Sequence, residues 1–329
     1  MLAPNGPIPL LRNDAPFTES TELCDKLTIR VENGINRLYS ADPDENWLPG
    51  YPALSLEPAD VVHCLLQELP TPKLDKMHPY LWLVGTQASS HISPLHEQII
   101  RGREIIITEN PELHLVWVNN KVFIKPLPRF LLSYNFWQLY LSNPKPVSLH
   151  SNQVNIDQIR KAALGYMRTY YYLVRHESDF RLAQREHLIP SGISFSQFVA
   201  FTSGFNRIGD HEVSLRYQFG QLRLNRLNLW AKVALRQWQF QKVQWQYADI
   251  IAQYYAPLLF LFGILSLVLS AMQVGTQARP EWNVFLGVSA WFSVLTLLFA
   301  VIVLVLFAAL LLFLSLRELH FALRKKHQA

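Results

Sequence analysis

The sequence predicts an α+β soluble domain (a small antiparallel sheet with helices), then a mostly helical layer and an α-helical two-span membrane hairpin. Between Glu104 and Lys125, short apolar runs with strand-like alternation are separated by turn residues. Near the C-terminus, two charge-free apolar stretches, residues 256–272 and 284–316, flank a short polar loop. Runs of about 18 or more apolar residues indicate transmembrane helices, because a backbone in hydrocarbon must satisfy its own hydrogen bonds.

The N-terminal residues 1–52 are rich in Pro, Asn and Asp and carry few periodic apolar positions. Such a composition is typical of irregular structure, so we expect a largely irregular segment. An α+β cytosolic domain is expected over residues 53–205. Its first half should contain, in chain order, a helix over 57–69, a strand over 80–84, a helix over 93–100 and strands over 104–108, 113–118 and 122–125.

The last two of these strands are expected to form a hairpin. Asn119 and Asn120 separate them, and Asn tolerates the positive φ that a two-residue hairpin turn requires. Val116, Val118 and Phe123 should be among the strand residues. Beyond the hairpin, helical spacing predicts the mostly helical layer, with helices over 130–141, 157–186 and 194–203.

Residues 206–253 are expected to form a basic amphipathic helix that leads to the membrane. No acidic residue occurs between Val213 and Ala248, whereas several Lys and Arg do. We hypothesise that this helix lies on anionic lipid headgroups, with about 1 kcal/mol gained per well-placed base. The alternative is a helix that covers the domain, since bases beside a span are expected on topology alone. The candidate membrane-surface residues are Arg216, Arg223, Arg226, Trp230, Trp238 and Trp245.

The hairpin is expected over residues 254–316, with spans at 254–273 and 286–312. The loop between the spans carries only Arg279, which Glu281 offsets, whereas the tail at 317–329 is basic. Cytoplasmic flanks collect Lys and Arg. We therefore expect a multi-pass membrane protein with two spans and both termini in the cytosol.

A resemblance to a known family runs through five blocks of sequence: HISPLHEQIIRGREIIITENPELHLVW, VFIKPLPRFLLSYNFW, RTYYYLVRHESDFRLAQ, RYQFGQLRLNRLNLW and SLVLSAMQVG. In order and spacing they resemble a family of uncharacterised fungal integral membrane proteins with a cytosolic N-terminal domain and two C-terminal transmembrane helices. The similarity extends, with gaps, from near Ser20 to the second span. It implies a fungal source and a two-span anchor, and it brings no activity, cofactor or catalytic residue.

Candidate catalytic and metal-ligating residues are few. His176, Glu177 and Asp179 could form a metal site or an acid–base pair, but no second His follows at zinc-motif spacing. Arg175 and Arg181 lie beside them, which favours a structural ion-pair network.

Three further motifs give no catalytic or metal site. His91 and His96 are five residues apart, a spacing that does not align them on one helix face. His114 is expected to be half-buried on a strand. The stretch around Ser194 lacks the last Gly of a nucleophile elbow and predicts a helix N-cap. No phosphate-binding loop motif occurs. We therefore predict no catalytic, cofactor-binding or metal-ligating residue and no cofactor.

Two classes of function are compatible with these observations. The favoured one is a non-enzymatic membrane-anchored adaptor or scaffold; the alternative is a membrane-surface enzyme with an unrecognised site in the soluble domain. A polar pocket that gathers His91, His114, His176 or Glu177 would favour the enzyme. The expected partners are the lipid bilayer, anionic lipid headgroups and an unknown protein. No nucleic acid is expected, because lipid is the nearer polyanion. The two cysteines, Cys24 and Cys64, should be free and buried.

Overall fold

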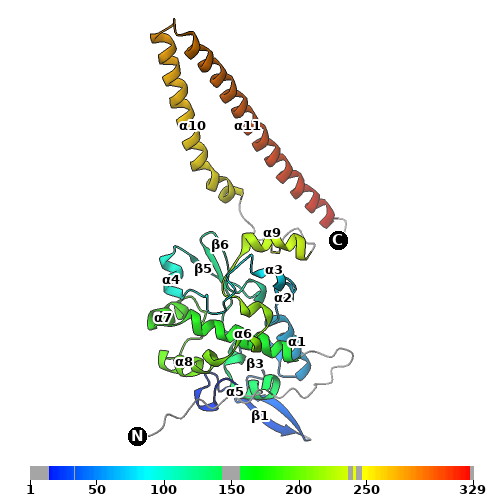
Figure 1. The fold of residues 1–329 in the computed structure, drawn as a ribbon. Helices are drawn as coiled ribbons and strands as arrows, with labels where there is room; N and C mark the ends of the chain where they lie inside the picture. The colour runs from blue at the N-terminus through cyan, green and yellow to red at the C-terminus, as the bar shows by residue number, and fades with distance from the viewer. Residues whose placement is uncertain (1–14, 33, 143–155, 236–239, 242–246, 327–329) are drawn as a thin grey trace, which may run out of the picture. The chain divides into compact units, whose positions relative to one another are not determined.

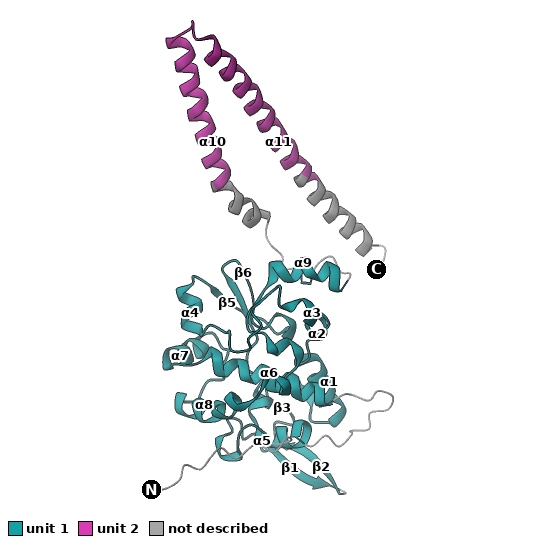
Figure 2. Cartoon of the chain, viewed as in Figure 1, with its two compact units in different colours: residues 1–242 teal, residues 243–329 magenta. Residues whose placement is uncertain are grey.

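The computed structural model describes residues 15–32, 34–142, 156–235, 240–241 and 247–326 (Figure 1). The chain divides into two compact units, residues 1–242 and residues 243–329 (Figure 2). The first unit holds the α+β fold and the second holds two long helices, so the predicted fold class is confirmed. Cys24 and Cys64 are both free and buried, as expected.

Two small hairpins lie in the described part of the N-terminal region. β1 (Leu27–Glu32) pairs antiparallel with β2 (Ile35–Ser40), and β3 (Trp47–Leu48) pairs with β4 (Tyr51–Ser55). The expectation of a largely irregular 1–52 was therefore wrong for the residues described. Their buried leucines belong to the core of the first unit: Leu27, Leu38 and Leu48. The missed signal is the period-two spacing of apolar residues along β1.

The main sheet has four strands in the order β5-β7-β6-β8. β6 and β7 form the predicted hairpin, in which Val118 pairs with Lys121 and Asn119 has a φ of 48°. The outer pairs, β5–β7 and β6–β8, are parallel. The strands are β5 (Glu104–Ile107), β6 (Val116–Val118), β7 (Lys121–Ile124) and β8 (Leu222–Arg223).

Helix α6 runs through the middle of the first unit, which holds eight other α-helices in its described part (Figure 1). The α-helices of this unit are α1 (Pro58–Glu68), α2 (Pro72–Lys76), α3 (His78–Leu81), α4 (Leu95–Ile100), α5 (Tyr134–Phe136), α6 (Ile156–Leu173), α7 (Glu177–Arg185), α8 (Phe195–Thr202) and α9 (Leu224–Ala234). Shorter 3₁₀ turns lie at Glu19–Thr21, Pro111–Leu113, Arg129–Leu132, Ser203–Arg207, Asp210–Glu212 and Leu215–Gln218, and a π-helix at Trp137–Ser142.

Three element predictions need correction. Residues 80–84 are not a strand, because α3 occupies their start and a turn follows. The helix expected over 157–186 is two helices, since Asp179 accepts backbone hydrogen bonds at residues 175 and 176 and starts a new helix there. The helix expected over 130–141 is divided into a 3₁₀ turn, α5 and a π-helix.

The region 206–253 is not one amphipathic helix either. Up to residue 235 it contains 3₁₀ turns, β8 and α9, and residues 247–253 are the start of α10. Many side chains between Val213 and Leu227 are buried in the first unit. Gly220 has no room for a side chain, because a Cβ there would overlap the carbonyl oxygen of His91. Gly165 of α6 similarly leaves space for the ring of Tyr217. Tertiary packing therefore overrides the helical spacing of this stretch.

The second unit consists of α10 (Tyr247–Ala278) and α11 (Asn283–Lys326), which contact each other. Within them, Pro257–Ala278 and Asn283–Ala309 are long and apolar enough to cross a membrane, with mean hydropathies of 2.2 and 2.9. These segments overlap the two predicted spans. The side of the membrane on which each end lies stays a prediction.

Candidate functional site

Helix α9 carries apolar residues on both of its sides. Leu224, Leu227 and Ala231 are buried at the spacing of one helix face and pack it onto the first unit. On the outer side, Leu229 and Val233 are 59% and 61% exposed. This helix therefore presents apolar side chains to its surroundings in addition to those that hold it in place.

The end of α3 extends this surface. The ring of Trp230 stacks on Tyr80, with centroids 6.1 Å apart, and the guanidinium of Arg226 donates to the carbonyl of Leu83 at 3.4 Å. Trp82 lies between Tyr80 and Leu83 in the sequence and is 62% exposed. We call the following residues the α9 face: Trp82, Arg226, Leu229, Lys232 and Val233, all of them exposed.

The predicted membrane-surface residues do not share one surface. Arg226 is exposed on α9, but Arg216 is only 1% exposed and Arg223 is half-buried. Trp230 is half-buried against α3. The three arginines do not lie on one helix as expected, because Arg216 is in a 3₁₀ turn, Arg223 is in β8 and only Arg226 is in α9. The two remaining candidates, Trp238 and Trp245, lie outside the described residues.

Arg216 is an internal structural residue. Its guanidinium donates to the carbonyls of Phe219 (2.9 Å), Gly220 (3.0 Å) and His114 (3.0 Å), and its backbone N–H donates to Asp75 Oδ1 (3.0 Å). Burial lowers its pKa to about 10, so it stays charged at neutral pH. The sequence does not indicate this role, because the guanidinium of Arg216 donates to backbone carbonyls, which every residue carries.

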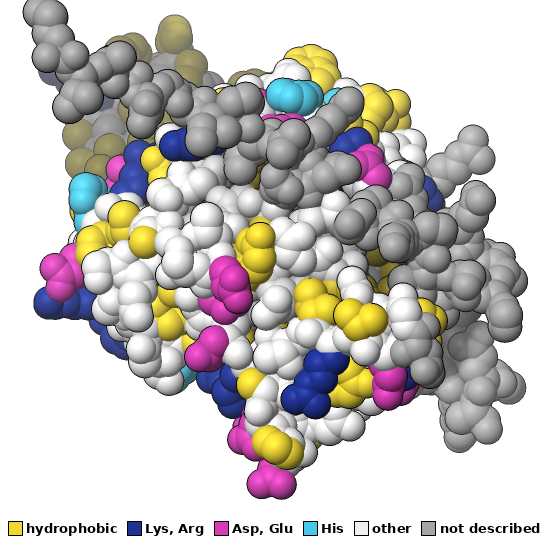
Figure 3. Space-filling model, turned by 90° about the horizontal axis from the view of Figure 1, so that it is seen from below, with side chains coloured by type: hydrophobic (Ala, Val, Ile, Leu, Met, Phe, Trp, Pro, Cys, Tyr) yellow, Lys and Arg dark blue, Asp and Glu magenta, His cyan; other side chains and the backbone are white. Residues whose placement is uncertain are grey.

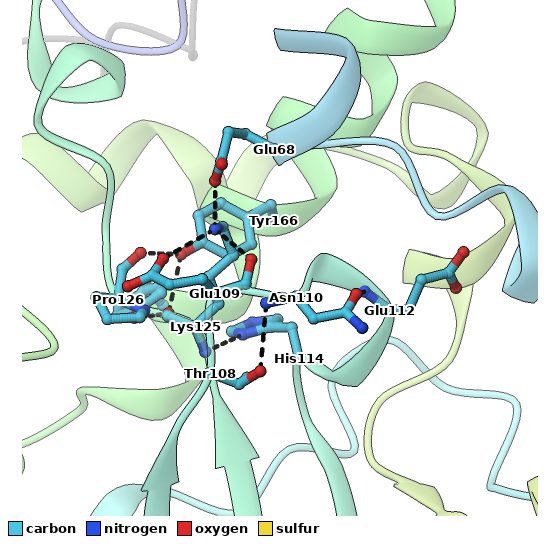
Figure 4. Close-up of polar contacts among 10 residues, drawn as sticks. Glu68, Thr108, Glu109, Asn110, Glu112, His114, Lys125, Pro126 and Tyr166 are labelled. Atoms are coloured by element: carbon cyan, nitrogen blue, oxygen red, sulfur yellow. Dashed lines mark hydrogen bonds and ion pairs between the residues drawn. The ribbon is translucent and has the colours of Figure 1, made fainter. Parts of the chain in front are cut away.

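A second internal network surrounds Lys125 (Figure 4). The ammonium donates to the carboxylate of Glu68 and to the carbonyl of Glu109, the latter at 2.7 Å. The carbonyl of Lys125 accepts from the hydroxyls of Tyr166 and Tyr170. These bonds join α1, α6 and the residue that follows β7, so the network holds the sheet against the helices.

His114 completes this interior and is fully buried, not half-buried on a strand as expected. Its Nδ1 accepts from the backbone N–H of Lys125 (3.1 Å). Thr169 Oγ1 lies 2.8 Å from Nε2 and itself donates to the carbonyl of Tyr166, so Nε2 carries the proton. Burial, with the charges of Arg216 and Lys125, holds the pKa of His114 well below 6.5, which keeps the ring neutral.

Asp179 caps α7 and binds α4. Its carboxylate accepts from the backbone N–H groups of His96, Arg175 and His176 and from the ring of His96 at 2.7 Å. Burial alone would raise the pKa of Asp179, but these hydrogen bonds lower it below its usual value. Beside it, Glu177 forms an exposed ion pair with Arg181 at 2.7 Å. The pair of Glu177 and Arg181 agrees with the expected ion-pair network, whereas the printed partners of Asp179 are backbone N–H groups and the ring of His96.

The residues that would indicate an enzyme have separate environments. His91 and His176 are exposed, and His114 is buried in the network around Lys125. Within the part of the chain that the structure describes, no group of three or more His, Cys, Asp or Glu side chains could hold a metal ion. Ser194 is the predicted N-cap: its hydroxyl accepts from the backbone N–H of Gln197, whose amide oxygen accepts in return from Ser194.

The face of the first unit seen in Figure 3 differs from the α9 face. Basic, acidic and hydrophobic side chains are interspersed over its described part, without a field of one charge. A mixed surface of this kind is typical of protein in contact with water.

Fold and site define a protein of two units: an α+β unit with an exposed apolar and basic helix face, and a pair of helices long and apolar enough to cross a membrane. The chain belongs to the family of unknown function DUF6601, whose model matches residues 61–300. The match begins in α1 and ends within α11, so it includes parts of both units. Comparison with curated proteins found no match, and comparison with solved structures found none either.

Proposed function

We propose that the chain is a membrane-anchored adaptor whose α9 face rests on the cytosolic surface of the bilayer. In this proposal α10 and α11 span the membrane, and both ends of the chain are cytosolic. The apolar length of the two helices supports the anchor. The basic tail and the nearly neutral loop between the helices support the orientation. The resemblance to fungal membrane proteins agrees with it.

The exposed apolar side chains of the α9 face are the observation that carries the proposal. Leu229, Val233 and Trp82 offer apolar area, and Arg226 and Lys232 flank it with positive charge. An interfacial helix buries such side chains at the level of the headgroups, where Trp is favoured and anionic lipid attracts bases. Each base close to the surface contributes about 1 kcal/mol.

Chain connectivity supports the same arrangement. Residues 235–246 separate α9 from α10. Even fully extended, a linker of this length keeps α9 within roughly 40 Å of the first apolar helix. The α9 face is thus tethered near the bilayer if α10 spans it, and a tether raises the effective concentration of the face at the surface.

An adaptor is favoured over an enzyme because the buried polar side chains have structural hydrogen-bond partners. His114, Lys125, Arg216 and Asp179 all hold secondary structure elements together. A protein surface held at a fixed place on the membrane is what an adaptor supplies to a partner. The identity of that partner is open to capture from native membranes with the full chain.

The test of docking uses the full chain in nanodiscs of phosphatidylcholine, with or without phosphatidylserine. A fluorophore is attached at Leu229→Cys and quenched by lipids that carry a spin label at the headgroup level. The two native cysteines are buried, so labelling is selective. The proposal expects quenching at residue 229 that increases with phosphatidylserine and weakens with salt above about 0.1 M, where exposed charges are screened over roughly 10 Å.

The matched control is Ile35→Cys in the β1–β2 hairpin, an apolar site with a similar exposure of 61%. It should show little quenching under the same conditions. Equal quenching at both sites, or none at residue 229, would contradict the proposal.

A further inference from the structure

A second cluster of bases surrounds Trp117 on the main sheet. The guanidinium carbon of Arg103 lies 4.1 Å from the ring centroid of Trp117, and that of Arg223 lies 5.1 Å from it. In the sheet register, Trp117 of β6 pairs with Arg223 of β8, so both side chains stand on the same face. Both guanidinium groups therefore contact the same aromatic ring.

Among the described residues, neither Arg103 nor Arg223 forms an ion pair; the nearest base in sequence, Arg101, is paired with Glu97 at 3.3 Å. Arg103 instead donates to two amide oxygens, those of Gln98 (2.8 Å) and Gln221 (3.2 Å). Two like charges near the same ring repel each other, and a bound anion would offset this repulsion by attracting both.

Unused hydrogen-bond donors point to the same place. Gln221 is only 7% exposed, and its Nε2 has no hydrogen-bond partner among the residues that the structure describes; the buried Nε of Arg223 has none there either. Gln221 directly precedes β8 and its Oε1 accepts from Arg103 at 3.2 Å, while Arg223 of β8 contacts the same Trp117 ring as Arg103. A buried donor without an acceptor costs about 1–3 kcal/mol, a cost that an added acceptor removes.

Hydrogen bonds through Gln98 hold Arg103 in position beside Trp117. Gln98 is fully buried, and its amide donates to the carbonyl of Ser93 while it accepts from Arg103. Arg103, Trp117 and Arg223 are half-buried, so a ligand can reach them. Guanidinium groups match the geometry of oxyanions with paired N–H donors, and fixed donors lose little entropy on binding.

We propose that Arg103, Gln221 and Arg223, arranged around Trp117, form a binding site for a phosphate group. Two guanidinium charges match the charge of a phosphate monoester near neutral pH. The amide of Gln221 supplies a further donor. The phosphate can come from a lipid headgroup, in which case the inference extends the proposed membrane docking, or from a soluble phosphorylated compound. The site shares no residue with the α9 face, so either can fail without the other.

Calorimetric titration of the full chain with inorganic phosphate tests the site. The chain is held in dodecyl maltoside, a detergent without phosphate, and acetate at equal ionic strength serves as the anion control. We expect heat of binding for phosphate and much less for acetate. Arg223→Gln and Arg103→Gln should each weaken binding about tenfold or more, whereas Arg101→Gln should leave it unchanged.

The lipid source is tested separately, by the melting temperature of the chain in phosphatidylcholine nanodiscs with or without phosphatidic acid. A headgroup ligand should raise the melting temperature in the wild type, and Arg223→Gln should remove that increase. An increase from soluble phosphate alone assigns the site to a soluble compound. Absence of binding to both probes, or equal binding by Arg101→Gln and Arg223→Gln, would overturn the proposal.

Gln221→Glu distinguishes a binding site from a structural cluster. The new carboxylate has the shape of the amide and would pair with Arg103 and Arg223 from within. We expect it to raise the melting temperature in phosphate-free buffer and to abolish phosphate binding. A lower melting temperature with phosphate binding retained would contradict an anion site at this position.

Discussion

Arg216 and Arg226 belong to the same acid-free stretch of sequence but have opposite surroundings. Arg216 is enclosed in the first unit and donates to three carbonyl oxygens, whereas Arg226 is on the outside of α9 beside exposed Leu229. The first holds the fold together and the second is available to the environment. A run of bases before an apolar helix therefore combines two roles, and only the tertiary structure separates them.

The difference follows from how each charge is solvated. A buried cation is tolerated only where acceptors replace water. Around Arg216 the carbonyls of His114, Phe219 and Gly220 do so, and Asp75 binds the backbone N–H of the same residue. Arg226 is exposed to solvent and makes one long hydrogen bond, to the carbonyl of Leu83 at 3.4 Å. Its charge can therefore act on a ligand or a lipid surface.

Substitution of the two arginines should give the largest difference. Arg216→Met leaves three carbonyls without their donor, and we expect a loss of about 3–5 kcal/mol in the free energy of unfolding, as when a buried charged partner is removed. Arg226→Gln should change it by less than about 0.5 kcal/mol. The measurement is thermal or denaturant unfolding of the full chain, followed by tryptophan fluorescence. Similar losses for both variants would break the comparison.

Gly220→Ala should have the next largest effect. The new methyl group would overlap the carbonyl of His91 and displace the segment that carries Arg216. Overpacking of this kind typically costs about 1–3 kcal/mol. Gly287→Ala is the control, because a Cβ at Gly287 has no atom within 4 Å and improves helix propensity. Equal melting temperatures for the wild type and Gly220→Ala would show that this segment adapts freely.

His114 predicts a pH dependence of the buried region. Its pKa in the fold is well below 6.5, so the unfolded chain binds a proton that the folded chain does not. Stability should therefore decrease as the pH falls below about 6.5. His114→Asn keeps an acceptor for the N–H of Lys125 but does not titrate, so its melting temperature should fall less between pH 7 and pH 5.

Asp75 and Glu112 change stability in the opposite direction at lower pH. Burial raises the pKa of both carboxyl groups, so the folded state gains stability by binding protons there. Both carboxyl groups are present in the wild type and in His114→Asn, so the difference between the two proteins isolates the effect of His114. Identical slopes for the wild type and His114→Asn would mean that another group controls the acid response.

Local signals in the sequence predicted part of this fold. The β6–β7 hairpin follows from Asn119 and Asn120, the start of α8 from the capping residue Ser194, and the two apolar helices from their composition. In each case the residues that decide the structure are neighbours in the chain. The hairpin of β1 and β2 also had a local signal, the period-two spacing of Leu27, Ile29 and Val31. The high content of Pro, Asn and Asp in residues 1–52 obscured this signal.

Long-range packing explains what the sequence did not reveal. β8 joins β6 from far along the chain, and this pairing interrupts the helix that was expected over residues 206–253. The acceptors of Arg216 are carbonyls, which side-chain identities do not disclose. The α9 face was predicted in part, through Arg226, but Trp82 is contributed by the end of α3 and becomes its neighbour only in the folded unit.

The variant with the smallest expected effect on stability tests the central claim, which is that the exposed bases of α9 act at the membrane and not in folding. The measurement is lipid quenching of a label at residue 229 in the Arg226→Gln, Lys232→Gln double variant, with the full chain in nanodiscs that contain phosphatidylserine. The account predicts a marked decrease in quenching, since each base contributes about 1 kcal/mol at the surface, and an unchanged melting temperature. Undiminished quenching, or a decrease accompanied by a lower melting temperature, would contradict it.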